Sequence, residues 1–216
     1  MASKMCFLVK ENTTYEEVVV DFTYIKGMAF SQKQKNVLSF HQSIKDNFPH
    51  ANILEVSTKS DNHLGVALSA FNLKLNGKCI ESIYQSAKVF SNGSHYPFLI
   101  NYPPKDAHQY ISEHANGELI KFNYENKDFP IKPKTFFYDY IYIQALTQIP
   151  QISSNLINYD IFTDIEFNEK KQINCQARAC AIYCYLLRTN SVKKHLESLD
   201  NFMKIYSPTI QQLSFI

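Results

Sequence analysis

Residues 64–90 read LGVALSAFNLKLNGKCIESIYQSAKVF and combine a hairpin signal with a helix signal. Asn76-Gly77 favours a tight turn between two antiparallel strands, so residues 73–80 are expected to form a hairpin. Residues 79–90 follow as an expected helix with one apolar face. At about 100° per residue, the opposite, polar face of this helix carries Glu81, Tyr84, Gln85 and Lys88.

Two interpretations of this polar face are open. An amphipathic surface helix with solvated charges is the ordinary one, and periodicity alone favours it. A lined cavity is the other, because a tyrosine and a glutamine on this face suit a cavity better than open water. The segment before the hairpin supports a cavity, since its small and polar residues let the backbone approach a ligand; these include Ser69, Phe71 and Asn72.

The N-terminal part of the chain predicts a small sheet. Residues 16–24 are rich in β-branched and aromatic side chains and are expected to pair as a strand with residues 6–9. Another strand, over residues 53–58, leads directly to Lys59. A lysine at a strand exit either contacts a ligand or is an ordinary solvated loop residue.

Three longer helices are expected elsewhere. Residues 31–48 form the first, and His41 on its apolar stripe is interpreted as a packing residue rather than a catalyst. Residues 134–148 carry a broad aromatic band that is typical of a core. Residues 192–206 read as an amphipathic helix, and residues 91–104 as a loop that could cover a site.

A second acidic position lies near the C-terminal end of the sequence. Asp164 and Glu166 are two residues apart, so in an extended segment they point to the same side and repel one another unless a ligand, an amine or water intervenes.

Residues 173–187 are apolar almost all round and predict a buried helix, although Asn174, Gln176 and Arg178 occupy its first two turns. The free amides of a helix N-terminus together with Arg178 suit a phosphate or diphosphate. An internal salt bridge of Arg178 with Asp164 or Glu166 is the alternative.

The composition limits the classes of function. With 216 residues, 45% of them hydrophobic, the chain is long enough for one domain with a sizeable core. A net charge of +2 argues against a strongly basic surface for a permanent nucleic-acid partner, but it allows a short single-stranded substrate. The chain has no apolar run of membrane-spanning length, and its five cysteines are interpreted as reduced core thiols, so we expect a cytoplasmic protein.

The motifs SAFNL, NGK and ESIYQSAKVF resemble, in this order, the signature of the NADAR or YbiA-like family. Four further segments resemble the branch of that family found beside DarT-type DNA ADP-ribosyltransferase toxins as the antitoxin: FSQKQKNVLSFHQSI, ILEVSTKS, IKPKTFFYDYIYIQAL and FTDIEFNEKKQINCQARACAI. The resemblance covers about residues 30–187. It implies an α+β fold, predominantly helical, with short strands and a hairpin, in which residues 1–29 add a strand segment to the NADAR-like domain of residues 30–216.

The resemblance also implies a function. NADAR proteins are N-glycosidases, and the toxin-associated branch removes ADP-ribose from guanine in DNA. The implied partners are ADP-ribosylated guanine in single-stranded DNA, ADP-ribose as product and a DarT-like toxin, with no membrane and no cofactor. Glu81 matches the family's general acid/base, Lys88 its lysine that orients or attacks the ribose, and Asp164 a catalytic acid. The implied substrate-binding residues are Lys59, Ser69, Phe71, Asn72, Tyr84, Gln85, Glu166, Asn174 and Arg178.

Two other functions stay open. The YbiA-like branch cleaves a small metabolite of the riboflavin pathway, and an antitoxin with a degenerate site could act by binding the toxin alone. Relatives usually carry an Ala-Lys-Arg-Asp-like basic cluster where this chain has Ala107-His108-Gln109-Tyr110, which puts a phosphate or base contact there in doubt. Glu81 and Lys88, in contrast, favour an enzyme.

Overall fold

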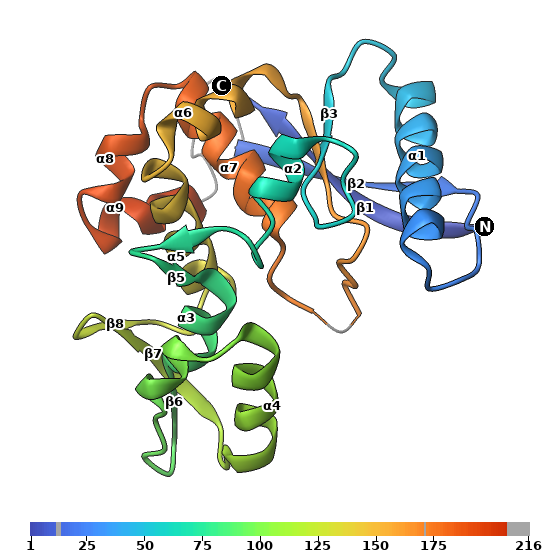
Figure 1. The fold of residues 1–216 in the computed structure, drawn as a ribbon. Helices are drawn as coiled ribbons and strands as arrows, with labels where there is room; N and C mark the ends of the chain where they lie inside the picture. The colour runs from blue at the N-terminus through green and yellow to red at the C-terminus, as the bar shows by residue number, and fades with distance from the viewer. Residues whose placement is uncertain (12–13, 171, 207–216) are drawn as a thin grey trace, which may run out of the picture.

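Within residues 1–11, 14–170 and 172–206, which the computed structural model describes, a four-stranded mixed sheet organises the N-terminal part (Figure 1). β1 runs antiparallel to β2 and β9, which confirms the predicted pairing of the two N-terminal strands. β9 comes from far along the chain and runs parallel to β3. The strand order is β2 (Thr14–Phe22), β1 (Ala2–Lys10), β9 (Ile161–Thr163) and β3 (Ile53–Glu55).

The first long helix, α1 (Phe30–Asn47), packs against this sheet. Its buried side chains Val37, Phe40 and Ile44 meet apolar residues of the strands. His41 Nε2 lies 2.8 Å from Thr163 Oγ1, and burial lowers the pKa of His41 to about 4. The histidine is therefore a neutral packing residue near pH 7, as predicted.

The predicted hairpin is present as β4 (Lys74–Leu75) and β5 (Lys78–Cys79). Asn76 and Gly77 in its turn have positive φ angles of 51° and 77°. A two-residue turn of this kind matches the natural twist of the strands, which explains why Asn-Gly is favoured there. The hairpin delivers the chain directly to α3 (Ile80–Ser86).

The predicted helix over residues 79–90 is wrong in its second half. α3 ends at Ser86, and the chain continues as β6 (Lys88–Phe90), which pairs with β7 (Leu119–Tyr124). β8 (Lys127–Phe129) completes that three-stranded sheet. Pairing with β7 gives hydrogen-bond partners to the backbone groups of residues 87–90, so a long-range contact overrides the local helical pattern.

The remaining helical segments also depart in part from expectation. The predicted helix over residues 192–206 is broken because Ser198 caps a new helix, its Oγ accepting a hydrogen bond from Asn201 N at 3.1 Å. The predicted loop over residues 91–104 contains the 3₁₀ helix η1 (Pro97–Asn101). None of the described helices is long and apolar enough to cross a membrane. The other bounds are α2 (His63–Ala67), α4 (Pro104–His114), α5 (Phe136–Thr147), α6 (Pro150–Ser153), η2 (Ser154–Asn158), α7 (Gln176–Arg188), α8 (Val192–Leu196), α9 (Leu199–Met203) and η3 (Lys204–Tyr206).

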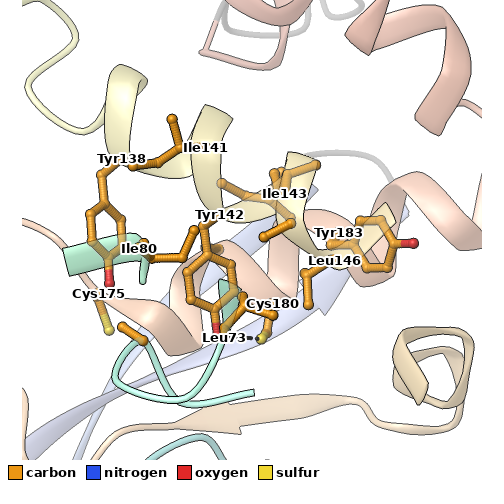
Figure 2. Packing of buried hydrophobic residues seen from close by; sticks show 14 of the residues in the cluster. Leu73, Ile80, Tyr138, Ile141, Tyr142, Ile143, Leu146, Cys175, Cys180 and Tyr183 are labelled. Carbon is orange, nitrogen blue, oxygen red and sulfur yellow. Dashed lines mark hydrogen bonds between the residues drawn. The ribbon is translucent and has the colours of Figure 1, made fainter. Parts of the chain in front are cut away.

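The main core lies between α5 and α7. Figure 2 shows the aromatic and aliphatic side chains of α5, among them Tyr138 and Tyr142, facing Cys180 and Tyr183 of α7. The aromatic band therefore forms core, as predicted. The five cysteines form no disulfide within the part of the chain that the structure describes, and Cys180 and Cys184 are fully buried. The chain is a single α+β domain.

A buried ion pair joins the two core helices. Arg178 Nη2 of α7 lies 2.9 Å and 3.0 Å from the two carboxylate oxygens of Asp139 on α5. The hydroxyl of Tyr206 donates a further hydrogen bond to Asp139 at 2.6 Å. The internal salt bridge that was the alternative for Arg178 is present, but its partner is Asp139. Asp164 and Glu166 are wrong as partners, because the guanidinium faces α5 rather than the segment that follows β9.

We predict that Arg178→Met lowers the free energy of unfolding by about 3–5 kcal/mol, because it leaves the Asp139 carboxylate buried without its cation. Urea unfolding monitored by circular dichroism measures the loss. The double variant Asp139→Asn/Arg178→Met is the control and should recover much of it, since neither charge remains. A loss below about 1 kcal/mol, typical of a surface pair, would contradict the prediction.

Candidate active site

A cavity of about 420 Å³ lies among α3, α4, α5 and the start of α7. We call it the Glu81 cavity. A larger hollow of about 640 Å³ between α5, α7 and α8 contains none of the residues predicted for the site. The predicted residues that line the Glu81 cavity are Phe71, Glu81, Asp164, Glu166 and Asn174.

Glu81 stands in the first turn of α3 and is held by Tyr138 of α5, whose hydroxyl donates a hydrogen bond to Glu81 Oε1 at 3.3 Å. Burial raises the pKa of Glu81, and the Tyr138 hydrogen bond and the charge of Lys88 oppose this only in part. A carboxyl group with a raised pKa keeps its proton to higher pH and suits general acid/base chemistry.

Lys88 lies on β6 rather than on α3 and does not line the cavity. Its Nζ donates a hydrogen bond to Gln85 Oε1 at 2.7 Å and lies 5.0 Å from the ring centroid of Tyr84. Burial lowers the pKa of Lys88 to about 8, although the charge of Glu81 acts in the opposite direction. The four residues predicted to share a face are therefore brought together, but by a strand and a helix.

Tyr84 connects this group to the cavity. Burial raises the pKa of Tyr84, and the nearby side-chain amide of Asn174 partly offsets this. Gln85 is buried, so the polar face of α3 is not a solvated surface.

Asp164 lies in a turn, so the extended segment expected for it is wrong. Its Oδ1 accepts hydrogen bonds from the backbone N–H groups of Glu166 at 3.0 Å and Phe167 at 3.2 Å. This local hydrogen bonding bends the chain just after β9. Glu166 instead pairs with Lys33 of α1 at 2.8 Å.

Glu55, at the end of β3, is a buried acid that sequence reasoning missed. It accepts hydrogen bonds from Ser57 Oγ at 2.6 Å, Thr163 Oγ1 at 2.7 Å and Ile165 N at 2.8 Å. Burial, followed by the charge of Glu55, raises the pKa of Asp164 to about 8. The sequence signal that could have identified Glu55 is an acidic residue within an otherwise apolar strand.

Gln176, at the start of α7, connects Asp164 to the segment before the hairpin. Its Nε2 donates to Asp164 Oδ2 at 3.0 Å, and its Oε1 accepts from Ala70 N at 2.6 Å. The flanking residue Phe71 lines the cavity, whereas Ser69 is fully buried and does not. Asn174 Oδ1, on the cavity wall, has no hydrogen-bond partner among the described residues and is available to a ligand.

Six of the nine predicted binding residues do not line the cavity: Lys59, Ser69, Asn72, Tyr84, Gln85 and Arg178. Lys59 Nζ lies 5.1 Å from the ring centroid of Phe30, and Asn72 donates to Val66 O at 2.8 Å. Arg178 is paired with Asp139, so this geometry does not support a phosphate role for it.

The cavity also has a basic wall that the sequence did not predict. Lys105 and His108, one turn apart at the start of α4, line it. Other lining residues not predicted are Pro104, Tyr138, Phe167, Gln172 and Gln176. Among the described residues, no group of three or more His, Cys, Asp or Glu side chains is placed to hold a metal ion.

Comparison with known proteins identifies the family of the chain. The chain matches none of the curated proteins. The family model described as DarT1-associated NADAR antitoxin matches residues 2–214, so the likeness extends beyond residues 30–187 at both ends. The chain belongs to the DarT1-associated NADAR antitoxin family.

Proposed function

We propose that the chain is an N-glycosidase that removes ADP-ribose from guanine bases in DNA and so reverses the modification made by a DarT1-type toxin. Membership of the family supports the association with the toxin. The observation that carries the proposed chemistry is the buried carboxyl of Glu81, which lines a cavity and is held by Tyr138.

Cleavage of an N-glycosidic bond needs a proton for the departing base and stabilisation of an oxocarbenium-like sugar. We assign the proton transfer to Glu81, because burial raises the pKa of its carboxyl. We assign to Asp164, the second buried acid on the cavity wall, a hydrogen bond to the sugar, because with its pKa raised to about 8 the carboxyl is mostly protonated near pH 7 and acts as a donor. Glu166 forms an ion pair with Lys33, so we assign it a role in substrate binding rather than in catalysis.

We assign to Lys88 the attack on the anomeric carbon of the ribose. With a pKa lowered to about 8 by burial, a substantial fraction of this amine is neutral near physiological pH. Its lone pair forms the new bond to carbon as the bond to guanine breaks, and Glu81 protonates the base. Ring opening gives an imine, which water hydrolyses to ADP-ribose and free lysine. For this step, the side chain must leave Gln85 and reach past Tyr84.

Binding of the substrate is assigned to the remaining walls. Lys105 and His108 are placed to meet the diphosphate, which favours charge-assisted hydrogen bonds. Asn174 Oδ1 offers a hydrogen-bond acceptor that has no partner among the described residues. The exposed ring of Phe71 at the cavity suits stacking on a base.

A non-catalytic antitoxin is the second candidate, because the family's basic cluster is missing at residues 107–110. Such a protein would contact the toxin without needing the cavity. The cavity's retained acids, its basic wall and Lys88 all favour the enzyme. A small riboflavin-pathway metabolite is less well supported, since the matching family is the toxin-associated one.

We predict that Glu81→Gln lowers release of ADP-ribose at least about a hundredfold, because positioned acid/base groups contribute about 10² to 10⁴. The assay uses a single-stranded oligonucleotide that carries ADP-ribosylated guanine. Glu16→Gln, at an exposed ion pair on β2, is the matched control and should keep full activity. Release by the Glu81 variant at near the wild-type rate would remove Glu81 from the mechanism.

We predict that Lys88→Arg folds but is severely impaired, because a guanidinium stays protonated and cannot form an imine. Borohydride added during turnover of the wild type should trap an adduct with the mass of the protein plus reduced ADP-ribose. Lys121→Arg, on the neighbouring strand β7, is the control. Full activity of Lys88→Arg would exclude attack by the lysine. If the variant is inactive but borohydride traps no adduct in the wild type, Lys88 is a positioning residue and not a nucleophile.

We predict that free ADP-ribose raises the melting temperature, because a ligand that binds only the native state stabilises it by mass action. Differential scanning fluorimetry of wild type and Glu81→Gln measures the shift, which both should show. A folded wild-type protein whose melting temperature does not move at a saturating concentration would favour the non-catalytic antitoxin.

A further inference from the structure

Aromatic side chains of η1 and α4 form a continuous cluster at the surface. The ring centroid of Phe98 lies 5.8 Å from that of Tyr102 and 5.3 Å from that of Tyr110. Phe98 is 45% exposed and Tyr102 is 43% exposed, whereas Tyr110 is half-buried beneath them. We call Phe98 and Tyr102 the aromatic platform. Two adjoining exposed rings on a rigid base differ from scattered surface hydrophobic residues.

The platform adjoins the Glu81 cavity. Ser82, the residue after Glu81, donates a hydrogen bond from Oγ to Tyr102 O at 2.8 Å. Two residues further along the chain, Pro104 and then Lys105 line the cavity. α3 contacts both η1 and α4, which lie beside it in Figure 1, so the platform and the cavity are built on neighbouring elements. Tyr110, on which Phe98 packs, lies on another face of α4 than Lys105 and His108, so the platform flanks the cavity rather than lining it.

The size of the cavity requires a surface for the rest of a DNA substrate. About 420 Å³ lies in the lower part of the range for a single bound ligand, roughly 300–1,000 Å³. The neighbours of a modified nucleotide must therefore lie outside, on the rim.

We propose that Phe98 and Tyr102 stack against the bases that flank the modified guanine of single-stranded DNA. This inference rests on the proposed function of the cavity. Stacking on aromatic rings tolerates any base, and it suits a protein whose net charge of +2 gives no long basic groove. Stable protein interfaces bury about 1,200–2,000 Å², far more than two rings provide, so a nucleic acid is the better occupant.

The test compares two substrates on the variant Phe98→Leu/Tyr102→Leu, which keeps apolar bulk but removes the rings. One substrate is a short single-stranded oligonucleotide with ADP-ribosylated guanine, and the other is ADP-ribosylated deoxyguanosine without neighbours. We expect KM for the oligonucleotide to rise about tenfold or more, with kcat and all constants for the nucleoside unchanged. Phe98→Tyr/Tyr102→Phe should retain wild-type values, as should Tyr24→Leu, which removes an equally exposed ring elsewhere.

Several outcomes would overturn the inference. Unchanged KM for the oligonucleotide would exclude the platform as a DNA contact, and an equal loss for both substrates would show that the rings only support the cavity. Unchanged oligonucleotide kinetics with lost binding to purified toxin would assign the surface to a protein. If the wild type releases no ADP-ribose, the proposed function fails. In that case fluorescence anisotropy with the labelled oligonucleotide still tests whether the platform binds DNA, because the variant should bind it more weakly than the wild type.

Discussion

The side-chain amide of Gln176 accepts a hydrogen bond from Ala70 N and donates one to Asp164 Oδ2, and both bonds are buried. A backbone N–H can only donate, so the carbonyl end of the amide must face Ala70 and its NH₂ must face the acid. One amide thus joins the segment before the hairpin, the start of α7 and the turn after β9. Removing it would leave buried polar groups unpaired, at about 1–3 kcal/mol each.

The electrostatic environment of Asp164, the acid bound by Gln176, comes from the mixed sheet. The parallel register of β3 and β9 places Glu55 opposite Thr163, so Asp164 follows directly beside a second buried carboxyl. Lys4 of β1 donates to Phe167 O and lowers the pKa of both acids in part. The N-terminal strands therefore supply a cation to the site although no sequence motif marks them for it.

The sequence predicted what local spacing determines. The Asn-Gly turn, the first helix and Glu81 at the start of α3 follow from side-chain patterns a few residues long, and the structure contains all three. The sequence did not predict contacts between residues that are far apart in the chain. Glu55 with Asp164, Gln176 with Ala70, and Asp139 with Arg178 all depend on how separate elements pack. For the same reason Arg178, whose position suggested a phosphate ligand, holds two core helices together instead.

The change from helix to strand at Ala87 shows how such a long-range contact shapes the site. Ala87 O accepts a hydrogen bond from Asn123 N of β7 at 2.7 Å, which ends α3 and turns Lys88 into the first residue of β6. A continued helix would have kept Lys88 in line with Glu81. On the strand, the amine instead folds back over Tyr84 to Gln85, where burial lowers its pKa. The same strand leads through residues 91–96 to the platform, so one short sheet positions both the lysine and the surface that we assign to the DNA strand.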